Sequence, residues 1–81
     1  MMKTVITLHY KGQVIQQWYG FPTEVKIQEG LDWIFDRVHV DRKFWRERRI
    51  RTTQGHLARI WESHKEPDMQ IVVGVKNEQN G

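Results

Sequence analysis

The sequence predicts an α+β fold, in which a small antiparallel sheet (an N-terminal β-hairpin plus a C-terminal strand) packs against two or three helices. Three observations predict it. Two β-prone runs flank a Lys-Gly turn, apolar residues recur with helical spacing between residues 24 and 39, and residues 69–75 are the most β-prone segment. The 81 residues suffice for one domain. We expect this domain to span residues 1–76 and a disordered polar tail to follow at 77–81.

The N-terminal hairpin is expected from strands at residues 4–9 and 13–19, because Gly12 between them supplies the positive φ of a tight turn. Both faces of this hairpin carry apolar residues, which predicts cover on both sides, from the chain's own helices or from a second copy of the chain in a homodimer. Pairing Tyr10 with Gln13 would place Leu8 opposite Ile15 and Val5 opposite Trp18.

The segment at residues 24–39 has the clearest helical pattern in the chain. Thr23 is suited to cap its amino end, whereas Gly30 lowers its helical propensity by about 1 kcal/mol relative to Ala. Its apolar face is made of Ile27, Leu31, Ile34, Phe35 and Val38.

Residues 41–62 allow two interpretations. We favour a helix at 41–49 and another that Thr53 caps, on which Leu57, Ile60, Trp61 and His64 share a face. The alternative pairs residues 49–53 with 56–62 as a hairpin around Gln54 and Gly55, which gives more strand and only one helix. For the favoured fold, the core is expected to contain Ile6, Leu8, Ile15, Leu31, Ile34, Phe35, Val38, Ile60, Ile71 and Val73.

Several kinds of chemistry find no support in the residues present. The chain has no Cys, its Gly residues are scattered singly, and its only Ser, Ser63, directly precedes His64, so that the two would point in different directions on a helix. The four His lack metal-ligand spacing. We therefore expect no enzymatic activity, no metal and no cofactor. No apolar run near the start is long enough for a signal peptide or membrane span, which favours a cytoplasmic protein without membrane contact.

The most informative feature is a basic stretch in the middle of the chain. Between Asp41 and Arg51, six cations and two anions leave a local charge of +4, whereas the whole chain carries +3. Arginines favour bidentate contacts to phosphate, and an interleaved aromatic residue, Phe44 or Trp45, can stack on a base. The pattern predicts nucleic-acid binding, to DNA more than to RNA, through Arg42, Lys43, Trp45, Arg46, Arg48, Arg49 and Arg51.

Residues 53–67, which begin Thr-Gln-Gly-His-Leu-Ala-Arg-Ile, resemble the recognition helix of phage-repressor-like helix-turn-helix proteins. The resemblance implies a regulatory protein of phage or mobile-element type, with Gln54, His56 and Arg59 contacting base edges in the major groove. Upstream, the chain departs from that family, because Glu47 and Arg51 stand where a small residue and a turn Gly are expected.

Two other interpretations of the basic stretch remain open. In one, the arginines and an exposed Trp bind an acidic protein, as in a small interaction or inhibitor module; four Trp are too many to bury in so small a core. In the other, Phe44 and Trp45 are core residues, and the arginines pair with Asp32, Asp36 and nearby acids.

Overall fold

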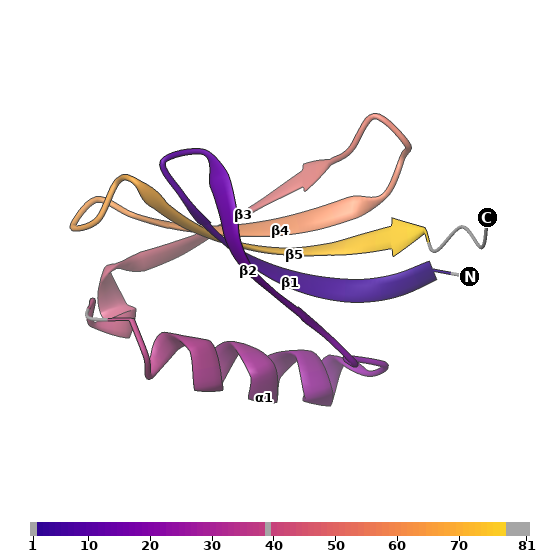
Figure 1. Cartoon of the computed structure of the whole chain (residues 1–81), viewed down its shortest axis with the longest axis horizontal. Helices are drawn as coiled ribbons and strands as arrows, with labels where there is room; N and C mark the ends of the chain where they lie inside the picture. Colours follow the sequence, from indigo (N-terminus) through magenta and orange to yellow (C-terminus); the bar gives the residue numbers. More distant parts are fainter. Residues whose placement is uncertain (1, 39, 78–81) are drawn as a thin grey trace.

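The computed structural model describes residues 2–38 and 40–77, which form one five-stranded antiparallel sheet with an α-helix on one of its faces (Figure 1). The spatial order of the strands is β2-β1-β5-β4-β3. In chain order the elements are β1 (Met2–Tyr10), β2 (Gln13–Tyr19), α1 (Glu24–Phe35), the 3₁₀ turn η1 (Arg42–Phe44), β3 (Trp45–Arg51), β4 (Leu57–Ser63) and β5 (Met69–Asn77).

The hairpin of β1 and β2 forms around Lys11 and Gly12, which both have positive φ values of 52° and 80°. Tyr10 pairs with Gln13, as predicted. A β-bulge then shifts the register between Leu8 and His9, because β2 contains one residue more than β1 can match. The predicted pairs beyond that point are therefore wrong by one residue: Leu8 lies opposite Gln16, Ile6 opposite Trp18 and Val5 opposite Tyr19.

Helix α1 forms where the apolar spacing predicted it, although it ends at Phe35 and not near residue 39. Thr23 is the N-cap, and its side-chain oxygen accepts a hydrogen bond from the backbone N–H of Lys26 at 3.2 Å. Leu31, Ile34 and Phe35 are buried against the sheet.

The predicted helices between residues 41 and 62 are wrong, and so are the three-stranded sheet and the two or three helices of the predicted fold class. This segment forms the β3–β4 hairpin, with Gly55 at φ 85° in its turn, as in the alternative interpretation. Strand β3 lies at the edge of the sheet, where a strand rich in arginine can keep its side chains in water. The apolar residues of β4 follow a helical spacing, which is why a helix was predicted there. Local spacing does not show that a segment pairs with an edge strand, so it could not distinguish the two interpretations.

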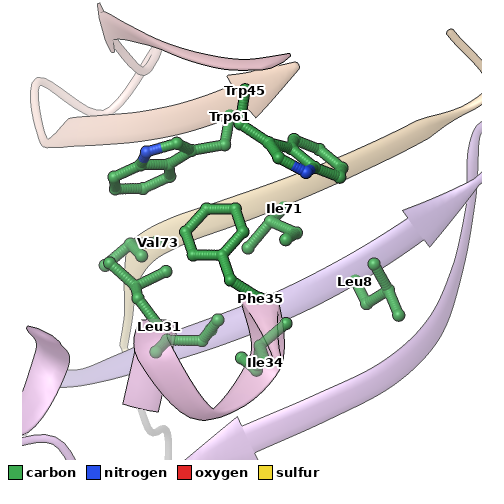
Figure 2. Close-up of a cluster of buried hydrophobic side chains, with 9 residues drawn as sticks. Leu8, Leu31, Ile34, Phe35, Trp45, Trp61, Ile71 and Val73 are labelled. Atoms are coloured by element: carbon green, nitrogen blue, oxygen red, sulfur yellow. The ribbon is translucent and has the colours of Figure 1, made fainter. Parts of the chain in front are cut away.

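The core lies between α1 and the sheet face that α1 covers, which we call the helix-side face (Figure 2). The ring of Phe35 meets Trp45 and Trp61 edge to face, with centroids 5.5 and 6.2 Å apart. Seven predicted core residues are buried, whereas Val38 lies half-buried at the rim, Ile60 is half-buried in β4, and Ile15 is 52% exposed beside the bulge. The seven are Ile6, Leu8, Leu31, Ile34, Phe35, Ile71 and Val73.

The opposite face of the sheet, here called the open face, is covered by no described part of the chain (Figure 1). Because side chains alternate along a strand, the neighbours of core residues point to it. They include Thr7, Arg46, Arg48, Ile60 and Val72. Strand β5 reaches Asn77, where the polar tail was expected to begin, and the rest of that predicted tail lies outside the described residues. Within residues 2–38 and 40–77, no helix has the length and apolar character needed to cross a membrane.

Candidate nucleic-acid interface

The alternation of β3 divides the basic stretch between the two faces of the sheet. Trp45 points into the core, so the odd-numbered positions of β3 lie on the helix-side face and the even-numbered ones on the open face. Arg46 and Arg48 therefore point away from Arg49 and Arg51. The predicted cations do not form one surface.

On the helix-side face, a network of charged side chains joins β3, β4 and α1. Glu47 accepts hydrogen bonds from Arg49 at 2.8 Å and from Arg59 at 3.0 Å, and Arg59 also donates to Glu24 at 2.8 Å. Burial raises the pKa of Glu47, but the hydrogen bonds and positive charges of the two arginines together bring it below its ordinary value. Arg59 is only 20% exposed and also lies 4.8 Å from the Trp61 ring centroid, so it holds the fold together.

Arg42 and Arg51 also make hydrogen bonds within the protein. Arg42 forms an ion pair with Asp32, and this hydrogen bond, followed by that from Gln28, lowers the pKa of the Asp32 carboxyl. Arg51 donates to the carbonyl oxygen of Gly55 at 2.7 Å, across the hairpin turn.

The residues that resemble a recognition helix form the β3–β4 turn and strand β4, so the helix implied by that resemblance is not present. Gln54 is exposed in the turn and His56 is half-buried beside it. Arg59 belongs to the network with Glu47 on the helix-side face. The structure therefore does not bring the three predicted base-reading residues together on one helix.

Side chains at the start of β3 and at the end of β4 meet at the end of the sheet that lies away from the hairpin turn. Trp45, the first residue of β3, pairs with Ser63, and their chain neighbours Phe44 and His64 contact each other edge to face, with centroids 5.7 Å apart and planes at 89°. A groove of about 730 Å³ opens beside them, which we call the Phe44 groove. It is lined by Phe44, Arg46, Glu47, Arg48, Glu62, Ser63, His64 and Pro67.

Positive charge surrounds this groove. The ammonium groups of Lys43 and Lys65 lie 5.3 and 5.0 Å from the centroid of the Phe44 ring. Arg48 is neutralised by Glu62, to which its Nε and Nη2 atoms donate at 3.0 and 2.8 Å. Lys43, Lys65 and Arg46 make no ion pair with any carboxylate in the described part of the chain. The groove thus combines three unpaired cations with an accessible aromatic ring.

Of the residues predicted to bind nucleic acid, Arg46 and Arg48 line this groove and Lys43 lies beside its aromatic ring. The predicted aromatic contact, Trp45, is buried in the core (Figure 2). Its neighbour Phe44 lines the groove. His64 and Lys65 were missed, because only the pairing of β3 with β4 brings them to Phe44.

A second, smaller concavity of about 200 Å³ lies between β2 and α1 and is lined only by apolar residues and Gly30. Its rim includes Trp33, which is 46% exposed, as expected for at least one Trp. The Arg37 guanidinium lies 3.6 Å from the Trp33 ring centroid. The sheet separates this cleft from the open face, and the residues that line the cleft include no charged side chain.

Comparisons with models of protein families, with curated proteins and with solved structures find no match to this chain. Among residues 2–38 and 40–77, no three His, Asp or Glu side chains come together as metal ligands would. What the Phe44 groove binds must therefore be inferred from its own geometry and charge.

Proposed function

We propose that this protein binds nucleic acid through the Phe44 groove. The observation that carries the proposal is the gathering of three unpaired cations, Lys43, Arg46 and Lys65, around one accessible aromatic ring. Phosphate groups are the ligands that lysine and arginine neutralise with release of counterions, and bases are the ligands that stack on an aromatic face. A single nucleotide unit supplies both.

The energies of cation–π contacts and of base stacking are consistent with a base displacing the lysine contacts that the Phe44 ring makes in the free protein. An exposed cation–π contact, such as those of Lys43 and Lys65 with Phe44, is worth about 0.5–1 kcal/mol. Stacking of a base on an aromatic side chain contributes about 1–3 kcal/mol. A base can therefore replace an ammonium group over the ring, and the ammonium then moves to a phosphate, where its charge is neutralised.

An acidic protein partner would use the cations but would gain less from the ring. The other arginines of the basic stretch give such a partner little, because Arg42, Arg48 and Arg49 already pair with Asp32, Glu62 and Glu47. Nucleic acid is therefore the better match to the groove. Polyglutamate provides the comparison, since it presents negative charge on a polypeptide without bases.

The experiment is a salt titration of oligonucleotide binding followed by fluorescence anisotropy. Three neutralised phosphates on a single strand predict a slope of about −2 in log affinity against log salt. The Arg46→Gln/Lys65→Gln variant removes two of the cations, so we expect its slope to be shallower by about 1.4 units and its affinity at low salt to fall at least tenfold.

The matched control is Lys26→Gln/Arg37→Gln, which removes the same net charge from helix α1 and the turn that follows it, on the other side of the sheet. We expect it to bind as the wild-type protein does. Equal losses in the two variants, an affinity for polyglutamate equal to that for the oligonucleotide, or no binding at 50 mM salt would each contradict the proposal.

A further inference from the structure

The ring of Phe44 is half-buried and is held at the end of the sheet by the perpendicular ring of His64. The edge-to-face contact with His64 fixes the orientation of the Phe44 ring, and the ammonium groups of Lys43 and Lys65 also lie over this ring. The Phe44 groove leaves open space beside this pair, between the side chains of β3 and the β4–β5 loop at Pro67. A planar group can enter there and lie against the ring.

Resting on the proposed function, we infer that the ligand is single-stranded where it meets the protein, with one unpaired base stacked on Phe44. In a duplex both faces of every base are covered by neighbouring base pairs, and only the base edges are accessible. A ring recessed in a groove can use the face of a base only if that base is already unstacked. Single strands and loops offer such bases at low energetic cost.

Three cations lie near the ring against which the base would stack. Lys43 precedes Phe44 in the chain, Arg46 follows it by two positions, and Lys65 reaches the same ring from the β4–β5 loop. The phosphates on either side of the stacked base would thus each find a positive charge. A single strand can use these cations without the broad surface that the two backbones of a duplex would need.

The Arg48–Glu62 pair gives the groove a polar wall. One carboxylate oxygen of Glu62, Oε2, takes part in neither hydrogen bond from Arg48. Carboxylate oxygens accept hydrogen bonds from the amino groups of bases. This wall would favour a base that carries an amino group over one that carries only acceptors.

Abasic oligonucleotides test the inference directly, because they retain the phosphates and lack the base. Four probes of equal length are compared: single-stranded DNA, single-stranded RNA of the same sequence, the corresponding DNA duplex, and single-stranded DNA with abasic sites. We expect the wild-type protein to bind the single strands at least tenfold more tightly than the duplex or the abasic strand. Whether DNA or RNA binds more tightly identifies the preferred sugar, and either preference supports the inference.

The variant Phe44→Leu keeps an apolar side chain but removes the stacking ring. It should lose about tenfold in affinity for the intact single strand and nothing for the abasic strand. Phe44→Tyr should restore binding. The control is Phe21→Leu, which alters another half-buried ring, one that packs against α1. Thermal unfolding of each variant establishes that it is folded.

The outcomes separate the inference from the proposed function. Equal or tighter binding of the duplex, or a Phe44→Leu variant that binds single strands normally, would overturn the inference. If Arg46→Gln/Lys65→Gln still weakens binding in that case, the proposed function stands. Absence of binding to all four probes would overturn both.

Discussion

Gly30 is the residue whose lack of a side chain the packing most clearly requires. A Cβ at this position would lie 2.4 Å from Cε1 of Phe21 and 3.1 Å from Cδ1 of Ile6. The Phe21 ring therefore packs directly on the backbone of α1. The loss of helical propensity at Gly30 is offset by the apolar surface that Phe21 buries there.

We expect Gly30→Ala to lower the free energy of unfolding by about 1 kcal/mol, although Ala favours helix by about the same amount. In the Phe21→Ala background the clash is relieved, so the same substitution should raise stability. Urea unfolding of the four proteins in this double-mutant cycle measures the coupling. A stabilising effect of Gly30→Ala in the wild-type background would contradict this account of the packing.

Phe44 and Trp45 illustrate what the sequence leaves undecided at single residues. Both are aromatic neighbours in a basic stretch where either can stack on a base, and Trp45 is the one predicted as a ligand contact. The strand register places the two rings in different surroundings, because Trp45 meets Phe35 in the core and Phe44 meets His64 at the groove. Residues 20 positions apart in the chain make that second contact, so no local pattern predicts it.

At the scale of elements, the Glu47 network is the charged contact that ties the helix to the β3–β4 hairpin. Arg59 on β4 binds Glu47 on β3 and Glu24 in the first turn of α1. The side chains of Arg59 and Glu47 are 20% and 27% exposed, so their ion pair is less screened by water than the exposed pair of Lys26 and Glu29.

The network predicts a pH dependence of stability. The pKa of Glu47 is lowered in the folded protein, so its contribution is complete above the unfolded-state pKa of about 4.3 and is lost as pH falls through the folded-state value. Glu47→Gln should therefore cost about 1 kcal/mol at pH 7 and less at pH 3. Urea unfolding at the two pH values measures the difference, with Glu29→Gln as an exposed control. A penalty that is the same at both pH values would show that charge is not its cause.

Elements with a strong local signature could be predicted from the sequence, and β3 and β4 could not. The turn at Gly12, the cap at Thr23 and the apolar run of β5 each act within a few residues, and each was predicted correctly. Strand β3 has a single buried residue, Trp45, and its other positions are charged or exposed. Its conformation comes from pairing with β4, and this tertiary contact overrides weak local preferences.

At the scale of the whole molecule, the two strands at the ends of the described chain, β1 and β5, lie side by side within the sheet. Met2 pairs with Asn77 and Tyr10 with Met69, so the pairing of β1 with β5 joins the two hairpins (Figure 1). If the chain is joined at its ends and opened between Gly20 and Phe21, the order becomes α1-β3-β4-β5-β1-β2. Every strand then pairs with its neighbour in sequence.

This circular permutant should refold several-fold faster than the native order, because loop closure no longer precedes the pairing of β1 with β5. Its unfolding rate should change less. Stopped-flow tryptophan fluorescence measures both rates, with the native chain carrying the same linker at its end as the control. Equal refolding rates would mean that another step limits folding.

The position of β5 also has a consequence during synthesis on the ribosome. Strands β1 to β4 leave the exit tunnel before residues 69–77, and until then β1 and β4 each have one hydrogen-bonding edge without its partner. The nascent chain therefore passes through a stage in which two hairpins each expose an unpaired strand edge. At that stage, binding by a chaperone or by another nascent chain competes with folding.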